Sequence, residues 1–188
     1  MSTKFFTNKK GNSLLQKLEG IFEHMDAHYF DAVVGFFRAS GYFKILPYIK
    51  DVHVVRILVG IDIDQLIWKA HSHGLEFREN ENLTRERYLA ELQKDIKQAD
   101  YTNEVESGMV QFIDDLISGK VQIKIHPSKK LHSKIYIFRQ EKEHEHAGYG
   151  SVITGSSNLT ESGLERNFEF NVELRDHDDV VFASQTFE

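Results

Sequence analysis

Residues 131–174 read LHSKIYIFRQEKEHEHAGYGSVITGSSNLTESGLERNFEFNVEL, and this stretch decides the fold. Three runs rich in β-branched and aromatic residues predict strands over Leu131–Phe138, Ser151–Thr154 and Asn167–Leu174. The last run alternates strictly, so its apolar side chains face one side of a sheet and its polar side chains the other. The polar segment 140–150 is predicted to be a hairpin-like loop.

Further strands and helices alternate on either side of this stretch. Apolar residues recur at helical spacing from Ser13, a predicted cap, to Met25, and the runs Tyr29–Phe37 and Val52–Ile61 predict buried strands. The other expected elements are helices over Tyr42–Ile49, 62–71, 76–106 and Val105–Ser118, a strand over Val121–His126, and a helix from Asp176 onward. This order predicts an α/β fold in which helices flank both faces of one mixed β-sheet.

Length and composition limit the class of protein. A chain of 188 residues fits one domain with a substantial core, and the absence of Cys excludes disulfides, thiol chemistry and Cys-ligated zinc. No apolar run is long enough for a transmembrane helix, and residues 1–16 lack the apolar core of a signal peptide, so a cytoplasmic location is expected. The sequence stops inside a predicted helix. We therefore expect residues 1–188 to be a single domain forming the N-terminal part of a longer protein.

The charge is unevenly distributed. The net charge of −6 argues against a surface that grips nucleic acid everywhere. Residues 116–140, however, contain no acidic residue and carry six cations: Lys120, Lys124, Lys129, Lys130, Lys134 and Arg139. This basic window indicates a local anion site. A charged strand and loop facing water is the alternative.

Three groups of residues in the deciding stretch have chemical potential. His132 and Lys134 lie two apart on a predicted strand and would project from one face, where an imidazole could attack a phosphoryl group held by the ammonium. Ser156 and Asn158 follow a predicted strand at a glycine turn and can donate hydrogen bonds to anionic oxygens. A helix cap is the simpler explanation for these two residues. Glu169, on the polar side of the alternating run, could orient an imidazole, or could simply face solvent.

Together these residues resemble the signature of the phospholipase D superfamily. Members carry His-x-Lys, then Gly-Ser-x-Asn at a strand-to-helix turn, then a Glu on the next strand. Here His132-Ser133-Lys134, Gly155-Ser156-Ser157-Asn158 and Glu169 match those elements in that order. The chain resembles the nuclease-type members, which have one copy of the signature rather than two.

The resemblance implies a specific mechanism. His132 would be a nucleophile that forms a covalent phosphohistidine, while Lys134, Ser156 and Asn158 bind the phosphate oxygens and Glu169 orients the imidazole. A second histidine must protonate the leaving group, so two chains would pair as a homodimer that joins two His132 residues. The resemblance implies no metal and no cofactor. The expected function is hydrolysis of DNA as the nuclease part of a helicase or restriction-type protein, with no membrane partner.

Two positions and two rival functions qualify this interpretation. The family often has Asp where this chain has Arg139, and Arg38 is expected to be a turn residue or a secondary phosphate contact. One rival is a catalytically silent module that dimerises and binds nucleic acid for an attached motor. The other is a phosphodiesterase for small nucleotides or lipids.

Two histidine pairs offer a metal alternative. His71 and His73, and likewise His144 and His146, place imidazoles near acidic side chains and could bind zinc or nickel. A solvated polar segment is the simpler interpretation of each pair.

Overall fold

A single seven-stranded sheet organises the chain. The computed structural model describes residues 3–63, 68, 72, 103–127, 130–141 and 149–187. The strands are β1 (Phe5–Thr7), β2 (Tyr29–Phe37), β3 (Val54–Ile63), β4 (Val121–Ile125), β5 (Ile135–Arg139), β6 (Gly150–Gly155) and β7 (Phe170–Leu174). Their order is β1-β7-β6-β5-β2-β3-β4, with β2, β3 and β4 parallel and the other neighbours antiparallel. The predicted mixed sheet is therefore confirmed.

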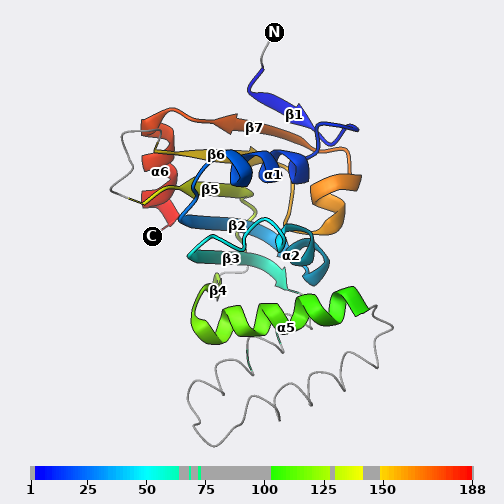
Figure 1. Cartoon of the computed structure of the whole chain (residues 1–188). Coiled ribbons are helices and arrows are strands. Elements are labelled where there is room, and N and C mark those ends of the chain that lie inside the picture. The colour runs from blue at the N-terminus through cyan, green and yellow to red at the C-terminus, as the bar shows by residue number, and fades with distance from the viewer. Residues whose placement is uncertain are drawn as a thin grey trace, which may run out of the picture.

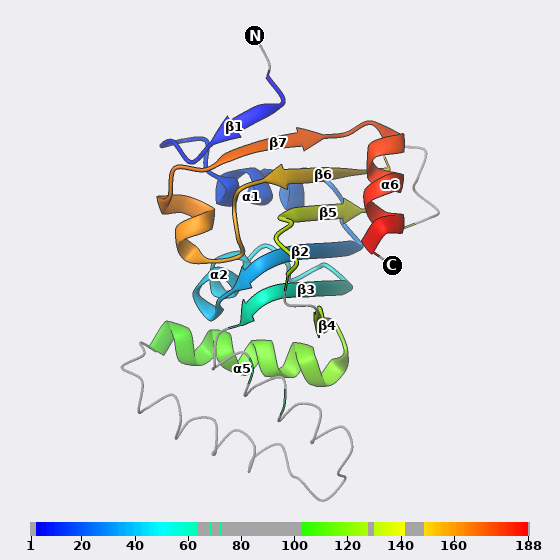
Figure 2. The ribbon, with the colours of Figure 1, turned by 180° about the vertical axis from the view of Figure 1, so that it is seen from behind.

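Helices cover both faces of the sheet, as predicted, but unequally. One face carries α1 (Leu14–His24), α2 (Ala39–Ile45), α5 (Asn103–Ser118) and the short π-helix η2 (Ser162–Arg166) (Figure 1). The opposite face carries α6 (His177–Phe187), which packs on β5 and β6 (Figure 2). We call these the front face and the back face.

Most of the hydrophobic core lies on the front face. Fully buried side chains from α1 (Leu14), α5 (Phe112) and β2 (Phe30) belong to one continuous cluster there. A smaller cluster on the back face joins Ile137 and Val152 of the sheet to Val180 of α6. Because β2 contributes to the larger cluster with alternate residues, Asp31 is left facing the back of the sheet, where it is fully buried.

Helix α1 begins at the predicted cap. The Ser13 side chain accepts a hydrogen bond from the Gln16 backbone N–H at 3.2 Å, and the Gln16 side chain accepts one from the Ser13 N–H at 3.0 Å. This capping box satisfies two backbone donors that the first turn cannot pair internally. Local sequence therefore determines where α1 starts.

Several predicted boundaries were wrong. The strand predicted over Leu131–Phe138 begins at Ile135, because the preceding residues cross over β3 and do not pair in the sheet. The helix predicted over Tyr42–Ile49 is α2, which starts at Ala39 and ends at Ile45. Pro47 has no N–H with which to extend that helix. Strand β1 was not predicted, since its three residues become a strand only by pairing with distant β7.

Other predictions fall outside the described residues. These are most of the helices predicted over 62–71 and 76–106, and most of the loop 140–150. Within the part of the chain that the structure describes, no helix is both long and apolar enough to cross a membrane.

Candidate active site

Three of the predicted site residues meet at one end of the sheet. Lys134 precedes β5, Ser156 follows β6 and Glu169 precedes β7, and these strand ends lie together (Figure 2). The Gly155 N–H donates to the Lys134 carbonyl at 3.3 Å, and the Ser156 N–H donates to the Phe170 carbonyl at 3.2 Å. Antiparallel pairing thus brings together residues that are distant in the sequence.

Ser156 and Glu169 contact each other directly. The Ser156 hydroxyl donates a hydrogen bond to the Glu169 carboxylate, and the same hydroxyl oxygen accepts the Phe170 N–H at 3.1 Å. The Asn167 side-chain amide donates to the other Glu169 oxygen at 3.3 Å. The carboxylate is half-buried, and Ser156 is exposed to solvent. The polar groups of this pair are therefore accessible at the surface.

His132 and Lys134 lie just outside the sheet, so the prediction that they share one face of a strand was wrong. The Lys134 ammonium donates to the His132 carbonyl oxygen at 2.6 Å. The His132 side chain is exposed. Among the described residues its ring makes no hydrogen bond, so orientation of the imidazole by Glu169 stays a prediction.

The Asn158 side chain is bound to strand β2, which lies next to β5 in the sheet. Its side-chain oxygen accepts the Phe36 N–H at 3.0 Å, and so its amide nitrogen is the end that can serve an anion. The backbone of Asn158 is packed against Gly163 of η2, where an added Cβ would lie 2.4 Å from the Asn158 carbonyl oxygen. The turn is thus tightly packed from both sides.

A buried polar network beneath this turn was missed by sequence reasoning. The Tyr136 hydroxyl donates to the Ser157 carbonyl at 2.9 Å, and the Asn171 amide donates to the Ser157 hydroxyl at 3.0 Å. All three residues are buried. Burial, with a smaller contribution from the Glu169 charge, raises the pKa of Tyr136 well above its ordinary value, so the hydroxyl stays a neutral donor. The alternation in 167–174 placed Asn171 on the polar side, but gave no sign that this side is buried.

Arg139 has a structural partner. The Asp31 carboxylate is fully buried and contacts Arg56 at 2.6 and 2.7 Å and Arg139 at 3.1 Å. The Arg139 guanidinium also lies 4.9 Å from the centre of the Tyr29 ring. Arg139 therefore ties β5 to β2 on the back face. Arg38 acts as the residue before α2, where its N–H donates to the Leu159 carbonyl at 3.1 Å.

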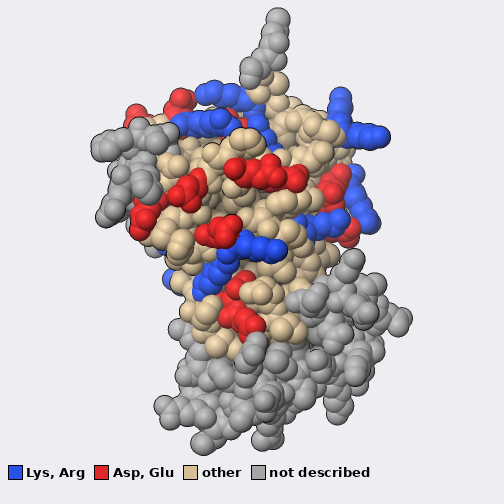
Figure 3. All heavy atoms as spheres, viewed as in Figure 1, with Lys and Arg blue, Asp and Glu red and all other residues tan. Residues whose placement is uncertain are grey.

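Three described cations of the basic window have separate partners in different parts of the fold. Lys134 lies at the candidate site, Arg139 is engaged by Asp31, and the Lys120 ammonium donates to the Lys50 carbonyl at 2.7 Å. On the front face, basic and acidic side chains are interspersed (Figure 3). The described residues of this face therefore form no broad basic surface (Figure 3).

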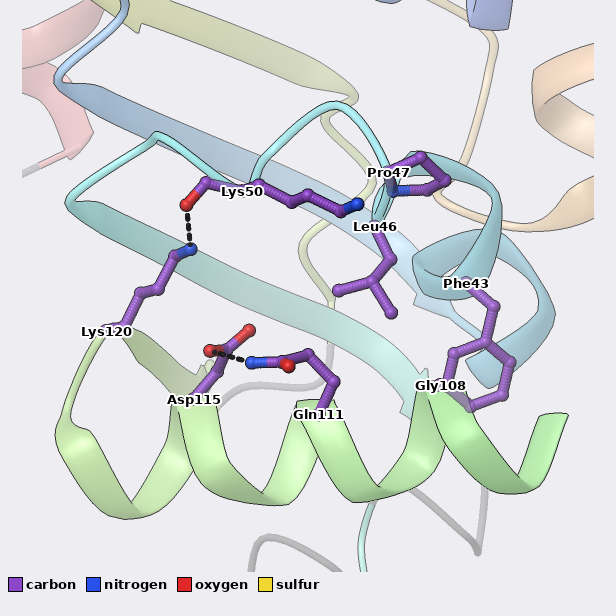
Figure 4. Close-up of a pocket in the computed structure, with 8 residues that line it drawn as sticks. All are labelled: Phe43, Leu46, Pro47, Lys50, Gly108, Gln111, Asp115 and Lys120. Carbon is purple, nitrogen blue, oxygen red and sulfur yellow. Dashed lines mark hydrogen bonds between the residues drawn. The ribbon is translucent and has the colours of Figure 1, made fainter. Parts of the chain in front are cut away.

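A pocket of about 520 Å³ lies elsewhere, between α2 and α5 (Figure 4). The buried Asp115 carboxylate in it accepts hydrogen bonds from Gln111 at 2.9 Å and from the Tyr42 hydroxyl at 3.2 Å. None of the predicted site residues lines this pocket. The Tyr42–Asp115 hydrogen bond joins the two helices.

The metal alternative gains no support from the described ranges. Within residues 3–63, 103–127, 130–141 and 149–187 no three His, Asp or Glu side chains are grouped so that they could hold a metal ion. His71, His73, His144 and His146 lie outside the described residues.

The family model described as "Cardiolipin synthase, PLD-like domain" matches residues 54–188, which is well over half of the chain. The chain belongs to the phospholipase D-like family. It carries one copy of the family signature, His132 to Glu169, and all the matched motif residues fall within the matched region. No curated protein matches the sequence.

Solved structures show the same fold. NucT from Helicobacter pylori is 11% identical with a TM-score of 0.50, and the match covers 97% of this chain and 91% of NucT. Polyphosphate kinase from Porphyromonas gingivalis is 10% identical with a TM-score of 0.51, over 93% of this chain but 23% of the kinase. Nuc from Salmonella typhimurium, described as a phospholipase D family member, is 13% identical with a TM-score of 0.49. At these identities the likeness to NucT and to the polyphosphate kinase shows the fold alone, and this fold is the mixed α/β arrangement that the sequence predicted.

Proposed function

We propose that this domain hydrolyses phosphodiester bonds in DNA without a metal, through a covalent phosphohistidine on His132. The observation that carries the proposal is the meeting of the Lys134, Ser156 and Glu169 segments at one end of the sheet, next to His132. An ammonium, a hydroxyl and an amide can together stabilise the charge that develops on phosphate oxygens. Family membership supports the same chemistry.

The reaction has two steps in this proposal. An imidazole nitrogen of His132 forms a bond to phosphorus as the bond to the leaving oxygen breaks, and that oxygen takes a proton from His132 of the partner subunit. Water then gives a proton to the now neutral His132 of the partner subunit and attacks phosphorus, and the bond from phosphorus to the nucleophilic His132 breaks. Lys134, Ser156 and Asn158 would hold the non-bridging oxygens. The Glu169 carboxylate has enough lone pairs to keep Ser156 and Asn167 and also accept an imidazole N–H.

The second histidine requires a homodimer in which two sites face each other. We infer that the domain works in the cytoplasm as the nuclease part of a longer helicase or restriction-type protein. NucT supports this proposal through its fold alone. The match covers almost the whole of both chains, as expected if this domain has the same single-unit arrangement as NucT.

A specific observation favours a second candidate, the silent DNA-binding module. The site groups are bonded to one another, with Lys134 on the His132 carbonyl and Ser156 on Glu169. A substrate phosphate would have to compete with both of these hydrogen bonds. If that competition fails, the domain dimerises and binds nucleic acid without cleaving it.

Incubation of the purified chain with DNA in excess EDTA separates the candidates. We expect the wild-type protein to cleave DNA in the presence of EDTA. The cleavage rate of His132→Ala should be lower by about a thousandfold or more, because the nucleophile is removed. His24→Ala, which removes another exposed histidine from the end of α1, is the matched control and should cleave normally. Wild-type protein that binds DNA but never cleaves it would support the silent module. Turnover of small phosphodiesters that DNA does not inhibit would instead support a nucleotide or lipid phosphodiesterase.

A further inference from the structure

The segment that carries His132 passes over strand β3 at one glycine. Gly60 lies on β3, and an ideal Cβ built there would come 2.0 Å from the Leu131 carbonyl oxygen, 2.5 Å from the Leu131 Cβ and 2.8 Å from the Leu131 carbonyl carbon. Contacts below 3.0 Å are essentially never made by real Cβ atoms. The Leu131 backbone therefore occupies the space that any side chain at position 60 would need.

The backbone of Gly60 itself does not require glycine. Gly11 and Gly119 have positive φ angles of 83° and 81°, whereas Gly60 does not, although it lies where the pairing of β3 with β2 shifts register between Val34 and Phe36. Val59 next to it pairs normally with Val34 and with Ile125. Close approach of the Leu131 peptide is thus a physical reason for a glycine at this position, in addition to the register shift at which Gly60 lies.

Further contacts anchor the two ends of the nucleophile segment on the sheet. On its N-terminal side, the last described bond to the sheet is from the His126 N–H to the Val59 carbonyl, at 2.8 Å. On its C-terminal side, the Lys134 carbonyl is held by the Gly155 N–H and by the Thr154 hydroxyl at 3.0 Å. Between these anchors, Leu131 lies directly on Gly60 and His132 follows it. The depth of this contact therefore helps to set how far His132 stands from Ser156 and Asn158.

We infer that Gly60 is a positioning residue for His132, which lets the nucleophile segment lie close enough to the sheet to share one phosphate with Lys134, Ser156 and Asn158. The expected effect on kcat rests on the proposed function, whereas the expected effect on the position of His132 does not. A Cβ at position 60 would push the Leu131 oxygen away by about 1 Å, from 2.0 Å to at least 3.0 Å. A misplacement of about 1 Å at a reacting group can cost about a hundredfold in rate.

The test compares Gly60→Ala with Gly20→Ala. Gly20 lies in α1, where an added Cβ meets nothing within 4 Å, so that variant controls for the loss of glycine alone. For Gly60→Ala we expect kcat on DNA to fall about a hundredfold while KM changes less than threefold, because Ser156 and Asn158, which follow β6, stay in place. We also expect the His132 ring resonances in NMR spectra to shift. The resonances of His28, which precedes β2 at the end of that strand away from the site, should stay unchanged.

The two measurements distinguish the two ways of failing. If the wild-type chain cleaves no DNA, the proposed function fails, and the His132 resonances alone decide the role of Gly60. Normal kcat together with unshifted His132 resonances would overturn the inference.

If Gly60→Ala does not fold, the double variant Gly60→Ala, Leu131→Gly replaces it, since glycine removes the Leu131 Cβ and can turn its carbonyl aside. We expect the double variant to fold and to shift the same resonances. A folded double variant with wild-type kcat and resonances would also overturn the inference.

Discussion

At the scale of single residues, Glu173 shows how the front of the sheet tolerates a buried charge. Its carboxylate is 7% exposed and contacts Lys17 of α1 at 2.7 Å, Arg175 at 2.6 Å and the Ser151 hydroxyl at 3.0 Å. Burial alone would raise the pKa of Glu173, but the hydrogen bonds and charges of Lys17 and Arg175 outweigh it and hold the pKa below its ordinary value. The charged carboxylate of Glu173 therefore links β7 to α1 through Lys17.

The lowered pKa has a direct consequence for stability. Glu173 contributes fully above the pKa of the unfolded chain, about 4.5, and its contribution is lost as pH falls through the lower folded-state pKa. We expect Glu173→Gln to reduce the free energy of unfolding at pH 7 by roughly 1–3 kcal/mol and to flatten its decline in acid. Urea unfolding between pH 3 and pH 7 measures this. Exposed Glu141→Gln is the control, and an equally steep decline in both variants would refute the assignment.

At the scale of elements, Asp31 joins three neighbouring strands. It lies on β2 and binds Arg56 of β3 and Arg139 of β5, on the back face that α6 only partly covers (Figure 2). This contact explains why an arginine is compatible with the fold at a position where related proteins often carry Asp. Because Arg139 has this structural role, an arginine at position 139 does not by itself argue against catalysis.

Asp31→Asn tests that structural role. Loss of the carboxylate charge leaves two largely buried guanidinium groups facing each other without an anion, and we expect a loss of roughly 3 kcal/mol in unfolding free energy. Asp178→Asn, at a fully exposed position, should change stability by less than about 0.5 kcal/mol. Chemical denaturation monitored by circular dichroism gives both values. Equal stability of the two variants would contradict the ion-pair account.

Sequence reasoning recovered the elements whose signals are local. The cap at Ser13, the β-branched runs of β2 and β3 and the strand that ends near Gly155 each depend on neighbouring residues, and each was predicted. It missed what depends on contacts between distant segments. The pairing of Phe5 with Val172 makes β1, and the contact of Leu131 with Gly60 keeps residues 131–134 out of β5. Neither contact leaves a pattern in the sequence around it.

At the scale of the whole molecule, the topology accounts for the site better than any single motif does. The order β7-β6-β5-β2 places the ends of four strands side by side, and each end carries one element: Glu169, Ser156, Lys134 and the Phe36 amide that holds Asn158. The same residue types were named from the sequence, because their chemistry is visible there. Their proximity was not visible, nor was the Ser156–Glu169 hydrogen bond.

The most direct test of the central claim is detection of the covalent intermediate. Excess wild-type protein is mixed with end-labelled DNA in EDTA, stopped within milliseconds to seconds in alkaline detergent, where phosphohistidine survives, and digested for mass spectrometry. We predict a DNA fragment joined through phosphorus to the peptide containing His132, rising and then decaying as cleavage proceeds, and absent from His132→Ala. Complete cleavage by the wild-type protein with the label on another residue, or with no adduct at any time point, would contradict His132 as the nucleophile.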